Sequence, residues 1–244
     1  MMHLGIFGAG RLAAAIADEA RAVGHTVAWS LHRLEEPSTT DIDVAIDASA
    51  AEAVEGHVRW AVDAGIPLVI GTTGWVIPDL ETMVGTRIGV LTSSNFSFAV
   101  ALMRRFAEEL ARFADWYGEG DLAIFEQHHK AKRDAPSGTA LSMAQAIVKA
   151  SQRYHTWSAA EYRHDALPVA SLRAGAETGY HALYFDAPHE KLAITHQARD
   201  RKLFATGALK AAAWLQGKKG VYTMDDLVAS VLAEAEHGNL RRGG

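Results

Sequence analysis

The chain of 244 residues contains no cysteine. Without a thiol it cannot form a disulfide scaffold, a thiolate nucleophile or a thiolate-ligated metal site. This absence fits a reducing compartment, and we expect the protein to be cytoplasmic.

Long apolar runs and basic tracts are also missing. No stretch reaches the roughly 18 consecutive apolar residues of a membrane span, and Met1 to Ile6 do not have the pattern of a signal peptide. Lys and Arg number 24 against 29 Asp and Glu, which gives a formal net charge of −5. We therefore expect neither a membrane nor a nucleic acid as partner.

The first hundred residues alternate short apolar runs with longer helical patterns. The expected strands are 4–7, 26–29, 44–46, 68–70 and 88–91, and the expected helices are 12–23, 50–64 and a short one opening around Pro78. Strands that alternate with helices predict right-handed crossovers and a doubly wound parallel sheet covered on both faces.

The pattern changes after Asn95. Helices are expected at 98–113 and 140–149, strands at 122–125, 170–173, 181–185 and 191–195, and final helices at 204–215 and 225–233. The last two strands are too close for a crossover helix and should be antiparallel. We predict an α/β protein with a Rossmann-type dinucleotide-binding domain, 1–97 and 204–244. An α+β domain with a mixed or antiparallel open sheet, 98–203, is inserted into it for substrate binding and oligomerisation.

A glycine turn follows the first strand and opens the first helix. The residues Gly8-Ala9-Gly10-Arg11-Leu12-Ala13 have the spacing G-x-G-x-x-A. The first glycine permits a tight turn, the second lets the backbone approach a pyrophosphate, and the alanine permits close helix packing. The N-terminus of the helix offers N–H groups and partial positive charge to phosphates. An ordinary βα turn is the alternative, but the strand–turn–helix context favours a dinucleotide site.

The end of the second strand bears on which cofactor is used. NAD sites usually carry an acidic residue about 20 residues beyond the glycine turn. Here His32 and Arg33 occupy that region, ahead of Glu35 and Glu36. The two basic side chains favour a 2′-phosphate, and hence NADPH with NADH tolerated. The alternative is that Arg33 is a solvated loop residue.

The segment from Glu126 to Thr139 is the densest in chemical groups. It combines adjacent imidazoles, His128 and His129, with Lys132 and with a Pro-Ser-Gly-Thr turn into a helix N-terminus. Helix N–H groups, the Thr139 hydroxyl and cations suit a small dicarboxylate. Histidine or a perturbed lysine could also deliver a proton near neutral pH.

Two alternatives exist for this segment. A metal site could use His128 and His129, but the sequence offers no nearby third ligand at helical spacing, so we expect no metal. The segment could also be a basic surface loop, which spacing alone does not exclude.

The motif E-x-H-H-x-x-K-x-D-A-P-S-G-T-A, at 126–140, resembles the signature of the 4-hydroxy-tetrahydrodipicolinate reductase (dihydrodipicolinate reductase) family of lysine and diaminopimelate biosynthesis. The similarity covers nearly the whole chain. Further matching segments are Gly71-Thr72-Thr73-Gly74, Ser93-Ser94-Asn95-Phe96-Ser97, Arg173-Ala174-Gly175, Gly179-Tyr180-His181, 196–201 and 204–209.

The resemblance implies an oxidoreductase that uses NAD(P)H to reduce a cyclic imine formed with loss of water. It implies that His128 is the acid/base residue and Lys132 the proton donor, and that His129, Gly138 and Thr139 bind the substrate carboxylates. The implied cofactor contacts are Gly8, Ala9, Gly10, Arg11, Leu12, Gly71, Thr72, Thr73, Ser93, Ser94, Asn95 and Phe96. A homotetramer assembled through the inserted sheet domain is implied, with the imidazoles and the lysine facing the nicotinamide across a cleft.

The chain departs from the family pattern at two places. The glycine turn is one residue shorter than the family's G-x-G-G-R-M-G and ends in Ala13, and Ser93-Ser94 replaces a small-apolar or proline pair. Two other functions stay as alternatives. Another two-domain NAD(P)-dependent dehydrogenase would need a different catalytic set, such as a cysteine nucleophile. A nucleotide-sensing regulator would predict a decayed histidine–lysine segment.

Overall fold

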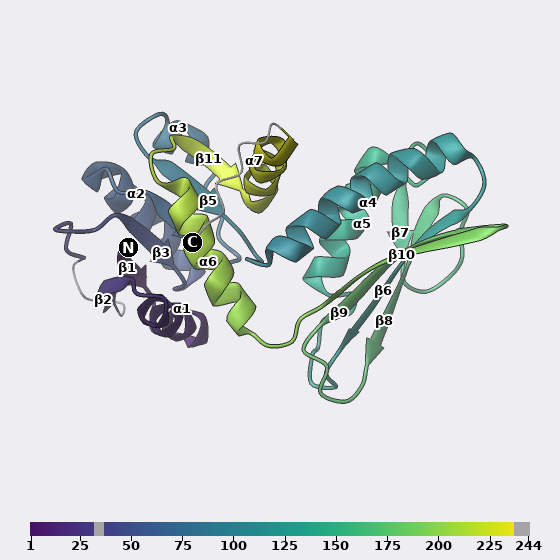
Figure 1. Cartoon of the computed structure of the whole chain (residues 1–244), viewed down its shortest axis with the longest axis horizontal. Helices are drawn as coiled ribbons and strands as arrows, with labels where there is room; N and C mark the ends of the chain where they lie inside the picture. Colours follow the sequence, from purple (N-terminus) through teal and green to yellow (C-terminus); the bar gives the residue numbers. More distant parts are fainter. Residues whose placement is uncertain (32–36, 237–244) are drawn as a thin grey trace. The chain divides into compact units, whose positions relative to one another are not determined.

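The computed structural model describes residues 1–31 and 37–236. The chain divides into two compact units (Figure 1): unit 1 is Met1–Phe98 with Lys202–Gly244, and unit 2 is Ala99–Arg201. Within the described residues, we find no helix with the length and apolar character needed to cross a membrane.

Unit 1 contains a six-stranded sheet in the order β11-β5-β4-β3-β1-β2, in which all the strand pairs are parallel. The strands are β1 His3–Phe7, β2 Thr26–Leu31, β3 Val44–Asp47, β4 Leu68–Ile70, β5 Gly89–Thr92 and β11 Gly220–Thr223. The expected doubly wound parallel sheet is confirmed. The strand order reverses between β1 and β3, the place where open α/β sheets bind ligands.

Helices cover both faces of this sheet. They are α1 Arg11–Ala22, the 3₁₀ helix η1 Ala51–Ala53, α2 Val54–Ala64, α3 Leu80–Val84, α6 Lys202–Leu215 and α7 Met224–Glu236. Helices α2 and α3 share an apolar core with strands β1, β3, β4 and β5, and α1 packs with α6. The helix expected at 50–64 begins instead as a 3₁₀ turn, which tightens its first residues.

Unit 2 contains a mixed five-stranded sheet in the order β10-β9-β6-β8-β7. Its strands are β6 Asp121–His128, β7 Thr156–Ser158, β8 Ala166–Arg173, β9 Tyr180–Ala187 and β10 Glu190–Gln197. Strand β9 is antiparallel to both β6 and β10, as expected for the last pair, whereas β8 is parallel to β6. Helices α4 Phe98–Tyr117 and α5 Gly138–Ala150 lie on the same side of this sheet (Figure 1).

The core of unit 2 lies between that face of the sheet and the two helices. Leu122 and Ile124 of β6 are aligned with Phe185 and Leu183 of β9, and all four side chains are at most 2% exposed. Alternate residues of a strand point to the same face, so the next positions on this face are Glu126 and His128. The apolar face therefore becomes polar at the carboxyl end of β6.

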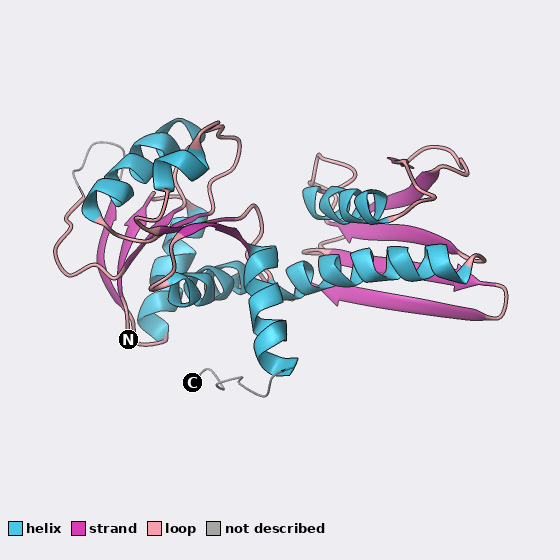
Figure 2. Cartoon of the chain, turned by 90° about the horizontal axis from the view of Figure 1, so that it is seen from above, coloured by secondary structure: helices cyan, strands magenta, loops and turns pink. Residues whose placement is uncertain are grey.

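Figure 2 shows the strands in magenta and the helices in cyan, and several strands differ from those expected. The strand expected at 122–125 continues through His128, so Glu126 and His128 stand on a strand rather than in a polar loop. Strands β7 and β11 were not predicted. They have three and four residues and are defined by pairing with β8 and β5.

Candidate active site

Four segments meet at the carboxyl edge of the unit 1 sheet. The turn at 8–10 follows β1, residues 48–50 follow β3, 71–73 follow β4 and 93–96 follow β5. The edge is held together by backbone hydrogen bonds, since the Gly71 N–H donates to the Asp47 carbonyl at 2.7 Å and the Ser93 N–H to the Ile70 carbonyl at 2.9 Å. Three of the predicted cofactor segments therefore lie along one edge.

The two glycines of the turn have different requirements. Gly8 has φ +116°, and a Cβ there would lie 2.3 Å from the Ala48 carbonyl oxygen, so only glycine fits. Gly10 has an ordinary φ of −77°, and a Cβ there would find no atom within 4 Å. Gly10 is also the N-cap of α1 and has no side chain to accept from the first N–H groups. The turn thus leaves open space in front of a helix N-terminus, as an anion site needs.

A pocket of about 400 Å³ adjoins this turn. It is lined by Phe7, Gly8, Ala9, Gly10, Leu31, Pro37, Ala48, Ser49, Ala50, Ala53, Gly56, His57 and Trp60. No acidic side chain is among these lining residues, which all belong to the described part of the chain. Arg33, the predicted 2′-phosphate residue, lies outside the described residues.

A buried carboxylate supports one wall of this pocket. The fully buried Asp47 accepts hydrogen bonds from His57 Nδ1 at 2.6 Å and from Thr72 Oγ1 at 2.5 Å. Burial raises the pKa of Asp47, but hydrogen bonds from His57, Thr72 and Ser49 outweigh it and hold the pKa below its usual value. The His57 ring stacks on Phe7 with centroids 3.8 Å apart. Neither Asp47 nor His57 was singled out in the sequence analysis. The signal that could have identified Asp47 is a carboxylate at the end of a buried apolar strand.

The segment after β5 is tightly packed. Phe96 is 2% exposed, and a Cβ on Gly207 would approach its carbonyl oxygen far inside van der Waals contact. Ser93 Oγ donates to the Asn95 carbonyl at 2.8 Å, whereas Ser94 is exposed. Phe96 therefore has a packing role, and cofactor contact by this segment stays a prediction.

In unit 2, strand register gathers the polar side chains. Glu126 of β6 is aligned with His181 of β9, and His181 with His196 of β10. One step further along β6, His128 is aligned with Arg173 of β8. Because these positions share one face of the sheet, residues far apart in sequence form one cluster.

Glu126 is the centre of this cluster and is fully buried. Its Oε2 lies 2.5 Å from His128 Nδ1, and its Oε1 accepts from Arg173 Nη2 at 2.6 Å and from the Ser137 N–H at 3.3 Å. Burial raises the pKa of Glu126, but hydrogen bonds from Arg173, Ser171 and His128 lower it by more. The pKa of Glu126 is therefore below its usual value. Glu126 is therefore an ionised carboxylate at neutral pH.

His128 is 8% exposed. Burial lowers its pKa, and the hydrogen bond with Glu126 offsets this only in part. Since Nδ1 faces Glu126, the Nε2 atom is left for other chemistry. A Cβ on Gly179 would lie 3.1 Å from that Nε2, so the glycine keeps this nitrogen uncovered.

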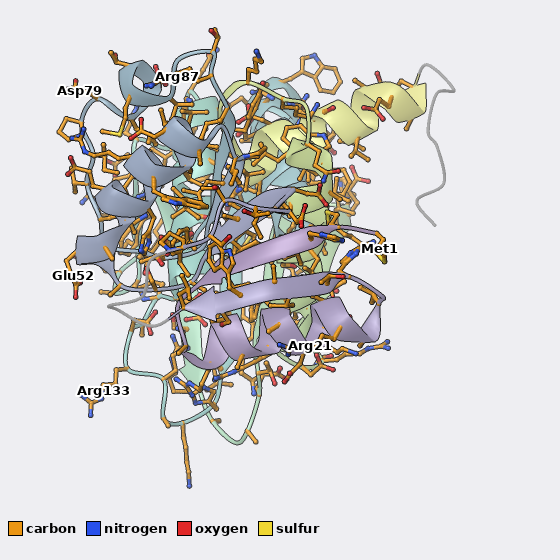
Figure 3. All side chains as sticks on the ribbon, turned by 90° about the vertical axis from the view of Figure 1, so that its left-hand side faces the viewer. Met1, Arg21, Glu52, Asp79, Arg87 and Arg133 are labelled. Carbon is orange, nitrogen blue, oxygen red and sulfur yellow. The ribbon has the colours of Figure 1, made fainter. Side chains whose placement is uncertain are left out.

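The predicted proton donor is connected to the same cluster. Lys132 Nζ lies 2.8 Å from the Asp134 carboxylate, and the Asp134 carbonyl accepts from Arg173 Nη2 at 2.6 Å. The hydrogen bond from Lys132 lowers the pKa of Asp134. The neighbouring Arg133 is different, because its exposed side chain extends away from the ribbon (Figure 3).

The predicted carboxylate-binding residues Gly138 and Thr139 are the first two residues of α5. Ser137 is the N-cap, and its Oγ accepts from the Ala140 N–H at 3.2 Å and lies 3.2 Å from His181 Nε2. A Cβ on Gly138 would have nothing within 4 Å, so the helix N-terminus is open there. His129, only partly buried, is held through its N–H by the Glu177 carbonyl at 2.7 Å.

The metal alternative takes a new form in the structure. Glu126, His128 and His181, not His129, have ligand atoms within 4.8 Å of one another. However, Oε2 of Glu126 already pairs with His128, and a guanidinium lies 2.6 Å from Oε1. A cation beside the carboxylate opposes binding of a second one. The cluster is therefore better suited to proton transfer than to a metal ion.

Two family descriptions match the chain. "Dihydrodipicolinate reductase, N-terminus" matches residues 2–96 and "Dihydrodipicolinate reductase, C-terminus" matches residues 99–228. The 4-hydroxy-tetrahydrodipicolinate reductase of Gluconacetobacter diazotrophicus is 37% identical over 197 residues, which cover 76% of this chain and 77% of the relative. That of Christiangramia forsetii is 30% identical over 236 residues, which cover 94% of this chain and 99% of the relative.

A solved structure gives the same fold. The dipicolinate-bound dihydrodipicolinate reductase from Paenisporosarcina sp. TG-14 superposes with a TM-score of 0.79 at 20% identity. The match covers 93% of this chain and 99% of that protein. With both halves of the family description matched and with curated relatives at 30–37% identity, the chain belongs to the dihydrodipicolinate reductase family of oxidoreductases.

Proposed function

We propose that this chain reduces 4-hydroxy-tetrahydrodipicolinate to tetrahydrodipicolinate with NAD(P)H, in diaminopimelate and lysine biosynthesis in the cytoplasm. The observation that carries the proposal is the buried Glu126–His128 pair, connected to Lys132 and to the open N-terminus of α5. The other unit of the chain carries the predicted dinucleotide turn at 8–13. Dipicolinate, bound by the solved relative, is a ring with two carboxylates, as the substrate is.

The residues have separate tasks in this reaction. One substrate molecule, one NAD(P)H and one proton give tetrahydrodipicolinate, water and NAD(P)⁺, and the bound cofactor supplies the hydride. Lys132 donates a proton, and His128 exchanges one at Nε2. The N–H groups of Gly138 and Thr139, the Thr139 hydroxyl and His129 bind the carboxylates. The turn at 8–12 and residues 71–73 and 93–96 hold the cofactor.

The test is a spectrophotometric assay with enzymatically generated hydroxy-tetrahydrodipicolinate. We expect the absorbance of the reduced nicotinamide to fall only when protein, cofactor and substrate are all present. The folded protein's failure to oxidise either NADPH or NADH in this mixture would refute the proposal.

NADPH is proposed as the favoured cofactor. A 2′-phosphate suits a basic residue, and the described lining of the glycine-turn pocket offers His57 and no carboxylate. We expect NADPH to bind more tightly than NADH in fluorescence titrations, and Arg33→Ala to remove most of the difference. Arg21→Ala, in the last turn of α1, is the control, and this variant should retain the difference in affinity between NADPH and NADH. Tighter binding of NADH by the unmodified protein would discard the role given to Arg33.

A homotetramer assembled through unit 2 is also proposed. The sheet face that α4 and α5 leave uncovered carries small and aromatic residues such as Phe125, Ala182 and Tyr184, and its Leu172 is 43% exposed. An apolar sheet face of this kind suits burial against another copy. Light scattering should give four times the mass of one chain, and Leu172→Lys should lower it. A monomer at assay concentrations would contradict the proposal.

A further inference from the structure

We propose that Glu126 is the positioning residue of this site: it fixes which nitrogen of His128 exchanges protons and connects His128 to the Lys132 loop and to the N-terminus of α5. Glu126 itself is 0% exposed, so it acts through its neighbours and does not contact the substrate. The inference deepens the proposed function, because it assumes that His128 is the acid/base residue.

The first step concerns the proton on His128. Arg173 only donates hydrogen bonds and holds Oε1 of Glu126 at 2.6 Å. An ionised carboxylate only accepts, so His128 Nδ1, 2.5 Å from Oε2, must carry the hydrogen. In the neutral ring Nε2 is then the acceptor, beside Gly179. Glu126 thereby leaves Nε2 as the nitrogen that takes up and releases a proton.

The second step concerns the helix. Oε1 of Glu126 accepts from the Ser137 N–H at 3.3 Å, one residue before α5. Ser137 Oγ accepts from the Ala140 N–H, so its own hydrogen is free to point to His181 Nε2 at 3.2 Å. The start of α5, where the carboxylates are proposed to bind, is therefore held by the same carboxylate as His128.

The third step concerns the lysine. Arg173 Nη2 donates both to Glu126 Oε1 and to the Asp134 carbonyl, each at 2.6 Å. The Asp134 carboxylate in turn pairs with Lys132 Nζ at 2.8 Å. Glu126 thus contacts the base His128 and the start of α5 directly. It is connected to the proton donor Lys132 through two residues, Arg173 and Asp134.

The decisive variant is Glu126→Gln, which keeps the shape and removes the charge. Arg173 would attract the amide oxygen, so the amide NH₂ would face His128 Nδ1 and force the hydrogen onto Nε2. We expect kcat to fall about 10²–10⁴-fold, as for a wrong tautomer or a lost acid/base group, with the dissociation constant for NADPH unchanged. Loss of the carboxylate should also move the His128 limb of the pH profile to lower pH.

Imidazole ¹⁵N NMR provides a readout that does not depend on activity. Resonances of His128, assigned by their loss in His128→Ala, should show Nδ1–H in the wild type near neutral pH and Nε2–H in Glu126→Gln. Glu109→Gln, on the exposed face of α4 where it pairs with Arg105 and Arg112, is the matched control and should change neither tautomer nor kcat.

The outcomes separate the two proposals. Nε2–H on His128 in the wild type, or wild-type kcat in a folded Glu126→Gln variant, overturns the role of Glu126. If the wild type has no reductase activity, the proposed function fails, yet the tautomer measurement still decides the role of Glu126. If Glu126→Gln does not fold, the wild-type spectrum alone makes that decision.

Discussion

Replacement of His128 with alanine is expected to lower kcat about 10²–10⁴-fold, the usual contribution of a general acid/base group. Replacement of Lys132 with alanine should have an effect of similar size. The hydrogen-bonded cluster that holds both side chains lies within unit 2, whereas the dinucleotide turn lies in unit 1. The affinity for NADPH should therefore be nearly unchanged in both variants. Steady-state kinetics and fluorescence titration of NADPH measure the two effects separately.

Arg133 offers a control for the charge of Lys132. It is the adjacent cation, but its exposed side chain extends away from the ribbon (Figure 3). Arg133→Ala should therefore turn over substrate close to the wild-type rate. Wild-type turnover in His128→Ala or in Lys132→Ala would remove that residue from the mechanism.

The second large effect concerns stability in acid. Burial, with a smaller contribution from His128, lowers the pKa of His181 from 6.5 to about 4. As the pH falls, His181 therefore takes up a proton at a higher pH in the unfolded chain than in the folded chain. The free energy of unfolding should decrease between pH 6.5 and 4, by about 3 kcal/mol for His181 alone. The titratable groups that act electrostatically on His181 are Glu126, His128, His196 and Lys132.

Other groups act in the same direction. Burial also lowers the pKa of His128 and of His196, which adds to the decrease below pH 6.5. Glu126 has a folded pKa below its reference value of 4.5, so its stabilising contribution is present above that pH and is lost as the pH falls further. The histidines and the carboxylate thus act in different pH ranges.

Urea unfolding at pH 7 and at pH 4.5 measures this effect. His181→Gln, which retains an acceptor for Ser137, should lose a large part of the difference between the two pH values. His189→Gln, an exposed residue in the turn between β9 and β10, should keep the full difference. An unchanged difference in His181→Gln would show that His181 does not carry the acid sensitivity.

Sequence periodicity predicted the fold where the signal was long or repeated. The parallel sheet of unit 1 followed from alternating strands and helices, and the antiparallel pair β9–β10 from a connection too short for a helix. Thr156–Ser158 and Gly220–Thr223 were missed, because three or four residues carry no period and their pairing partners are distant in sequence. The end of β6 was missed because Glu126 and His128 are polar, although they face the interior.

The candidate site was predictable where its residues are adjacent in sequence. The motif at 126–140 identified His128, Lys132 and the start of α5, and their proposed roles stay predictions. The partners that set their chemistry were not predicted as such. Arg173 and His181 reach Glu126 only through the register of β6 with β8 and β9, and His57 reaches Asp47 only when α2 packs on β1. Register and packing are properties of the folded chain that one sequence does not display.

The alignment of β6 with β9 also limits how the length of this chain could change during evolution. Side chains alternate between sheet faces, so an inserted residue inside β9 would move His181 to the uncovered face and bring an apolar neighbour to the carboxylate. The tip connecting β9 to β10, at Pro188 and His189, is exposed and could lengthen without shifting that alignment. Homologous chains should therefore vary in length at this tip and keep a constant spacing between His181 and Asp186 of β9.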